Sequence, residues 1–294
     1  MGAIVGGGIL ALAGVALATT GPAAILAFGL NGLIALLTAL SFAEMSSKFP
    51  ESGGTYTFAK KVLSVEAAFT VGWVVWFASI MAAVLYALGF AYFSMVMLSD
   101  LWQAVSGASS PWLTHSRTVT GVAVATTAVL ALVLMRKVAG GGVWVNVGKV
   151  VVFAVLITGG CWALTRTSAA DVASSLRPFF AAGFAGLLQA MGYTFIALQG
   201  FDLIAAVGGE VRNPERILPR AMVLALCIAL AIYLPLLFLI ATVGTPADQS
   251  IVEVAKANPE SIVARAAQFY LGPFGYWLVI VAAILSMLSA LLAN

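Results

Sequence analysis

Residues Ile4–Ile9 read Ile-Val-Gly-Gly-Gly-Ile, inside a stretch that carries no charge from Gly2 to Ala43. Three adjacent glycines favour an interruption of a helix, because glycine gives the backbone freedom and no side chain to pack. At bilayer depth an opened backbone survives only where it lines a cavity, and there its bare amides at the start of the next half-helix favour a carboxylate. The alternative is close helix packing through small residues, as the spacing of Gly2 and Gly6 allows, and the glycines alone leave both interpretations open.

A second interruption is predicted at residues 195–202, which read Phe-Ile-Ala-Leu-Gln-Gly-Phe-Asp. Gly200 lies in mid-span, and Asp202 is the only acidic residue inside any of the apolar stretches. If the helix opens at Leu198–Phe201, the freed carbonyls can receive an ammonium group. Asp202 would then cap the second half-helix at its positive end, with direct contact to a substrate or proton, or pairing with another cation, as alternatives.

The composition places both interruptions in a lipid bilayer. Of 294 residues, 62% are hydrophobic and 9% are charged, which excludes a soluble globule. Nothing alternates in the manner of a membrane β-barrel strand. The fold class is therefore an all-α polytopic membrane protein of about eight transmembrane helices, each needing about 20 apolar residues. The predicted spans are Ala3–Ala18, Ala23–Ala43, Ala67–Leu98, Thr118–Met135, Val143–Leu164, Phe179–Val207, Ala221–Val243 and Gly272–Asn294.

The loops and ends complete this organisation. Most of the 14 lysines and arginines fall in the loops of one side, which predicts a cytoplasmic N-terminus in a plasma or inner membrane. Short amphipathic helices are expected at Thr55–Leu63 and Ile251–Phe269. The third span is long enough to require a strong tilt or a protruding end. The short first span and the apolar last residues predict that the chain is part of a larger protein.

The two predicted interruptions lie five spans apart, in equivalent positions of two five-helix halves. Interrupted helices in corresponding positions point to the midplane binding site of a secondary transporter. One interruption offers amide donors to an anion and the other offers carbonyl acceptors to a cation. A zwitterion satisfies both.

Several motifs in order resemble the amino acid/polyamine/organocation (APC) superfamily of permeases. They are Gly6–Ile9, Gly21–Ala23, Phe42–Pro50, Ser52–Tyr56, Gly72–Trp73, Gly200–Asp202, Glu210–Pro214 and Pro219–Ala221. The resemblance implies an inverted 5+5 repeat with helices 1 and 6 broken. It implies one incomplete transmembrane domain over residues 1–294, with a first repeat at 1–165 that lacks its start and part of a second repeat at 179–294.

The resemblance also assigns roles to residues. The substrate carboxylate would lie at the amides of Gly6, Gly7 and Gly8, and the amino group at the carbonyls of Phe195, Ile196 and Leu198. Ile4 and Gln199 complete this set, and Phe201 would be an aromatic gate. Residues of a cytoplasmic gate would be Glu44, Glu210, Arg212 and Arg216, for which the alternative is a solvated charge cluster.

Lys149 is expected about 9 Å inside its span. In some members of this superfamily a lysine here replaces a sodium ion near serines of the eighth span, for which Ser286 and Ser289 are available. Ion or proton coupling through Lys149, Asp202 and these serines is one interpretation. Simple snorkelling of the lysine stem to the surface is the other.

The expected function is secondary active transport of amino acids by alternating access, coupled to protons or to exchange rather than to sodium. A polyamine or organocation exchanger and a non-transporting sensor are the alternatives, and a channel would not need to capture both charges of a zwitterion. No enzyme, catalytic residue, metal or cofactor is expected, since His115 is the only histidine and no nucleophile or metal motif occurs. The expected partners are a small amino acid or amine and the lipid bilayer, without nucleic acid.

Overall fold

A computed structural model describes residues 4–49, 51–136, 143–206, 209, 211–246 and 249–293, and every regular element within them is a helix. The elements, including two short 3-10 helices labelled η, are α1 (Gly7–Thr20), η1 (Gly21–Ala23), α2 (Ala24–Lys48), α3 (Gly54–Val62), α4 (Val65–Ser106), α5 (Ser116–Arg136), α6 (Val143–Leu164), α7 (Ala169–Ser175), α8 (Gly183–Thr194), η2 (Phe195–Leu198), α9 (Asp202–Ala206), α10 (Pro214–Thr242), α11 (Ile251–Ala257) and α12 (Ile262–Ala293).

Seven helical runs of the described chain are long and apolar enough to cross a membrane, which confirms the predicted all-α polytopic class. The first run, Gly7–Lys48, joins α1 and α2 across η1. The expectation of eight spans counted these two helices separately. The chain turns at Gly21, whose φ of 71° favours glycine, and Pro22 follows inside η1, so the turn lies between the first two predicted spans.

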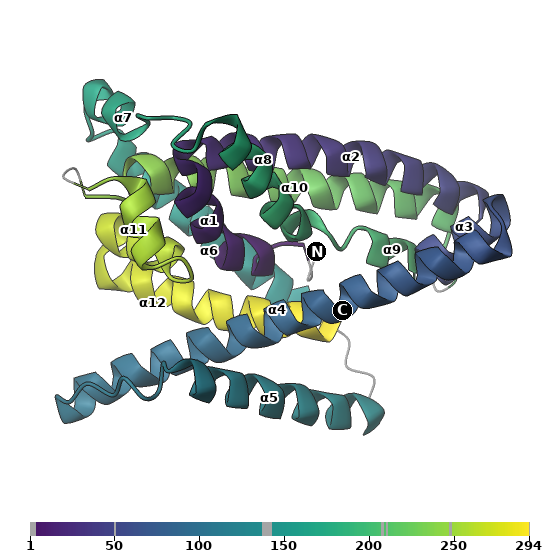
Figure 1. Ribbon diagram of the computed structural model, residues 1–294, viewed down its shortest axis with the longest axis horizontal. Helices are drawn as coiled ribbons and strands as arrows, with labels where there is room; N and C mark the ends of the chain where they lie inside the picture. The colour runs from purple at the N-terminus through teal and green to yellow at the C-terminus, as the bar shows by residue number, and fades with distance from the viewer. Residues whose placement is uncertain are drawn as a thin grey trace.

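The helices lie in two groups with α1 between them (Figure 1). One group contains α2, α8, α9 and α10, in which α2 and α10 run side by side. The other contains α4, α5 and α12. Helix α1 packs against α8 of the first group and α12 of the second, so its N-terminal glycines lie in the interior.

Helix α4 has 42 residues and is about 63 Å long at the helical rise. A bilayer core of about 30 Å cannot contain it upright, so part of α4 extends beyond the hydrocarbon or tilts strongly. Its large apolar side chains Trp73, Trp76 and Phe77 are exposed. A surface of this kind is expected where a helix faces lipid.

The two segments for which short amphipathic helices were expected, Thr55–Leu63 and Ile251–Phe269, do not both form such a helix. Helix α3 occupies the first of them, as expected. The second is not one short helix, because α11 ends at Ala257 and the next helix begins at Ile262 and continues into the last span. Gly272, with φ 68°, and Pro273 kink α12 where the predicted span starts. The apolar spacing did not indicate the break between these two helices at residues 258–261.

Candidate functional site

The first interruption is shorter than the glycine run suggests. Residues 4–6 are not helical, Gly6 has φ 109°, and α1 already begins at Gly7, so only one of the three glycines belongs to the opened backbone. No side chain caps this end of α1. The first amides of a helix have no partner within it, so those at Gly7 and Gly8 remain donors without a side-chain cap.

Each glycine faces a different neighbour at close range. A Cβ atom on Gly6 would lie 2.5 Å from Ser286 Oγ of α12, and one on Gly7 would lie 3.0 Å from the ring of Tyr86 on α4. A Cβ atom on Gly8 would lie 2.5 Å from the Cα atom of Ala197. Close packing therefore requires the glycine at position 8, which faces backbone, and is tight at Gly6 and Gly7, which face side chains, so the packing interpretation accompanies the opened backbone instead of replacing it.

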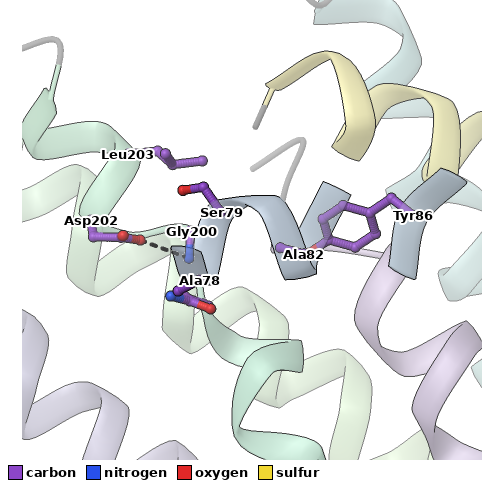
Figure 2. A pocket seen from close by; sticks show the side chains of 8 residues that line it. Ala78, Ser79, Ala82, Tyr86, Gly200, Asp202 and Leu203 are labelled. Carbon is purple, nitrogen blue, oxygen red and sulfur yellow. Dashed lines mark hydrogen bonds between the residues drawn. The ribbon is translucent and has the colours of Figure 1, made fainter. Parts of the chain in front are cut away.

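The second interruption separates α8 from α9. The chain leaves the α-helix at Thr194, passes through η2 and is extended at Gln199 before α9 starts at Asp202, with φ 121° at Gly200. The Asp202 carboxylate accepts a hydrogen bond from the Gly200 amide over 3.0 Å (Figure 2). This contact differs from the expected cap, because the amide precedes α9 instead of belonging to its first turn.

The two interruptions meet through one tyrosine. Tyr233 of α10 is 0% exposed, and its hydroxyl donates a hydrogen bond to the carbonyl oxygen of Ile4. The same hydroxyl lies 3.4 Å from the carbonyl oxygen of Ala197. Together with the contact of Gly8 on Ala197, this places the two interrupted backbones side by side.

Asn31 of α2 holds the end of α8. Its side-chain amide donates to the Met191 carbonyl over 2.8 Å and to Thr194 Oγ1 over 2.9 Å, and Thr194 donates in turn to Ala190. The Met191 carbonyl also accepts the backbone amide of Phe195, so Asn31 adds a second donor at a helix end whose last carbonyls have few partners within the helix. Asn31 therefore stabilises the helix end that precedes the interruption.

A cavity of about 20 Å³ opens beside the second interruption (Figure 2). Its walls come from α4 and from the interrupted backbone with the start of α9, and its lining residues are Ala78, Ser79, Ala82, Tyr86, Gln199, Gly200, Asp202 and Leu203. A volume of this size holds about one water molecule. An amino acid would need the walls to move apart.

The carbonyl groups predicted to receive an ammonium group are not equally available. The Ile196 carbonyl accepts a hydrogen bond from the Gln199 amide over 3.2 Å. Leu198 is fully buried, whereas Phe195 as a whole residue is 39% exposed. Phe201 is buried and its ring packs at a right angle on Phe42, with 5.7 Å between centroids, so it closes against α2 and not over the cavity.

Of the residues expected to couple ions, Ser286 lies beside Gly6, whereas Asp202 lies at the second interruption. Lys149 of α6 is 3% exposed, Ser286 is fully buried and Ser289 is 8% exposed. Phe153, one helical turn beyond Lys149, and Ser286 both contact the Gly6 position. Ser286 Oγ has no hydrogen-bond partner in the described part of the chain. A buried oxygen in that condition is a free acceptor for a cationic group.

The described residues of the predicted cytoplasmic gate form no ion pair with one another. Glu44 pairs with Lys48 on its own helix over 2.6 Å, and both side chains are more than half exposed. Arg212 and Arg216 are exposed, and neither forms an ion pair with a described residue. Glu210 lies outside the described residues. Both the cytoplasmic gate and the solvated charge cluster stay predictions for these residues.

Three polar side chains of the site were missed in the sequence. Tyr233 and Asn31 each place a polar group deep in an apolar span. Because such groups need buried partners, their positions in the sequence could have indicated the site. Tyr86 lines the cavity and covers Gly7, but a tyrosine in the long third span gave no indication of its direction.

Comparison with known proteins agrees with the resemblance seen in the motifs. The family model described as "Amino acid permease" matches residues 1–294. The serine/threonine exchanger SteT of Bacillus subtilis is 30% identical over 99% of this chain and 62% of its own length. The branched-chain amino acid permease BcaP of Bacillus subtilis is 28% identical, over 79% of this chain and 50% of its own length. The human cationic amino acid transporter 4 is 29% identical, over 80% of this chain and 38% of its own length.

The match covers only part of each relative. The chain spans about half to two thirds of the length of the first curated relatives that it matches. The predicted origin as part of a longer protein is consistent with this coverage.

Proposed function

Because the chain belongs to the amino acid permease family, we propose that it forms the substrate-binding part of a secondary transporter of amino acids. The substrate would lie between the start of α1 and the interruption after α8. Amides at Gly7 and Gly8 would receive its carboxylate, and carbonyls of residues 195–198 would receive its ammonium group. This division of donors and acceptors suits a zwitterion.

The observation that carries the proposal is the contact between the two interrupted backbones. Gly8 leaves no room for a side chain against Ala197, and Tyr233 reaches a carbonyl on each segment. Donors at a helix start and acceptors at a helix end therefore lie within the span of one small molecule. Neither an enzyme nor a passive pore needs that pairing.

The small volume of the cavity indicates that the substrate site is closed in this conformation. Its 20 Å³ cannot hold an amino acid, and α4 supplies the wall opposite the interruption. Transport by alternating access would open this site by moving α4 relative to α8 and α9. Phe201, packed on Phe42, would hold the side toward α2 closed.

Coupling through Lys149 forms the second part of the proposal. A snorkelling lysine keeps its ammonium group in water, whereas Lys149 is almost fully buried. The unpartnered Ser286 oxygen and the Gly6 backbone lie at the same junction of α1, α6 and α12. A change of protonation at Lys149 would therefore act on the opened start of α1, in place of a sodium ion.

Counterflow with the full-length gene product in proteoliposomes tests this function. A labelled panel of neutral, cationic and acidic amino acids and a polyamine would be measured at two pH values. Saturable counterflow of at least one amino acid is expected. Counterflow of the polyamine alone would select the organocation exchanger, binding without counterflow would select a sensor, and non-saturable flux would select a channel.

A further inference from the structure

The Tyr233 hydroxyl lies near two carbonyl oxygens but has only one proton to donate. It donates to Ile4, and the second acceptor, on Ala197, lies 3.4 Å away. A tyrosine hydroxyl is one donor, so it can satisfy only one of these acceptors fully at a time. The other depends on a partner that the tyrosine does not supply.

The interruptions are the reason that both carbonyls need a hydrogen-bond donor from outside their own helix. In a continuous helix each would accept from the amide four residues later. Residues 4–6 are not helical, and the backbone after Ala197 is extended at Gln199. An unpaired carbonyl is expensive in an interior without water, so each segment relies on donors from other elements.

The ring of Tyr233 is held in one orientation. It packs edge-on against Phe28 of α2, with 5.9 Å between centroids and an angle of 90°. Both rings are fully buried. The hydroxyl therefore has little freedom to leave the two carbonyls, and its proton can turn from one to the other by rotation about the C–O bond alone.

We propose that Tyr233 is a positioning residue that couples the two interruptions by sharing one hydroxyl proton between the Ile4 and Ala197 carbonyls. This proposal rests on the proposed function, since it assigns the coupling to the substrate site. When an ammonium group reaches one carbonyl, the proton turns to the other. Binding at either segment thereby orders both segments.

The experiment measures hydrogen exchange of backbone amides in the full-length protein in lipid nanodiscs, without substrate. Tyr233→Phe removes the hydroxyl and keeps the ring. Exchange at residues 4–9 and at residues 195–202 is expected to rise together, by about two- to tenfold, because each segment loses a shared hydrogen bond. Faster exchange at only one of the segments, or at neither, would overturn the coupling.

Tyr276→Phe is the matched control. Its hydroxyl donates to the Asp100 carboxylate over 2.7 Å, so the variant also loses one tyrosine hydrogen bond, between α12 and α4. It is not part of the substrate site, and exchange at both interruptions should stay unchanged. A rise equal to that of Tyr233→Phe would mean that general loosening of the bundle explains the effect, and the coupling would be rejected.

Replacing Tyr233 by 4-aminophenylalanine provides a second variant if the phenylalanine variant does not fold. An aromatic amine has two N–H donors and can serve both carbonyls at once. Exchange at both segments is therefore expected to match that of the unaltered protein or to be slower. Faster exchange at either segment would contradict the shared-proton arrangement.

Uptake separates this proposal from the proposed function. Tyr233→Phe should raise KM for every accepted amino acid by a common factor and keep their order of preference, because the hydroxyl acts on backbone groups and not on the substrate side chain. A changed order would overturn the positioning role. If the unaltered protein takes up no amino acid, the proposed function fails, while the exchange measurement still decides whether Tyr233 couples the segments.

Discussion

The two interruptions are stabilised in opposite ways. The start of α1 depends on the absence of side chains, since Gly6, Gly7 and Gly8 each admit a neighbour that a Cβ atom would displace. The interruption after α8 depends on polar side chains, with Asn31 before it and Asp202 after it. The first should therefore be sensitive to added atoms, and the second to lost hydrogen bonds.

Gly8→Ala should have the largest effect. The new methyl group would overlap Ala197 backbone atoms, which cannot turn away as a side chain can, so the two segments must separate. We expect substrate affinity to fall by at least about tenfold while the protein still inserts into the membrane. Equilibrium binding of a labelled amino acid measures this effect.

Gly192→Ala is the matched control for this change. Gly192 lies in α8, and a Cβ atom there would meet nothing within 4 Å. Affinity should stay unchanged. If both alanine variants bind equally well, close approach of the two backbones is not needed for binding.

Asn31→Leu should mainly reduce stability. It removes the side-chain donor to the Met191 carbonyl, which keeps the Phe195 amide, and the donor to the Thr194 hydroxyl, which keeps its bond to Ala190, so two hydrogen bonds are lost at about 1 kcal/mol each. Thermal unfolding in detergent should show a lower midpoint than that of the unaltered protein. Thr38→Ala, which removes an exposed hydroxyl bonded within α2, should not lower it comparably. Equal midpoints for the two variants would show that Asn31 does not hold the end of α8.

Lys149→Ala should change the pH dependence of uptake. Lys149 is buried on α6 one helical turn before Phe153, the α6 residue that faces Gly6, so we expect its protonation to affect the first interruption but not the second. We expect a flatter pH profile of uptake than that of the unaltered protein. Lys60→Ala, at an exposed position on α3, should keep the original profile. A Lys149→Ala profile identical to the original would assign this lysine to snorkelling.

Substitutions at Asp202 should have the smallest effect and distinguish its possible roles. Asp202→Asn keeps an oxygen that can accept from the Gly200 amide, whereas Asp202→Ala removes it. If Asp202 only holds this backbone, the asparagine variant should bind substrate within about threefold of the unaltered protein and the alanine variant more weakly. Equal losses in both variants would show that the charge itself contacts a substrate or proton.

The sequence predicted the membrane class because composition and the length of apolar stretches depend on the solvent alone. It also located the second interruption, since Gly200 next to Gln199 and Asp202 is unfavourable inside a helix at that depth. The extent of the first interruption was overestimated, because Gly7 and Gly8 are already helical at the start of α1, where they pack against α4, α12 and η2.

Long-range partners could not be predicted in the same way. Tyr233 and Ile4 are 229 residues apart, and Asn31 and Met191 are 160 apart. Periodicity within one helix shows that a polar group is buried but not which carbonyl it meets. For Glu44 a long-range gate contact was expected from its motif, but the structure pairs this residue locally with Lys48 of the same helix.

A cryo-EM structure of the full-length protein, saturated with an amino acid that it exchanges, would show whether one substrate contacts both interrupted segments. We expect the carboxylate at the amides of Gly7 and Gly8, the ammonium group at carbonyls of residues 195–198, and both segments still in contact with Tyr233. An amino acid bound elsewhere, or bound to only one of the two segments, would contradict this expectation.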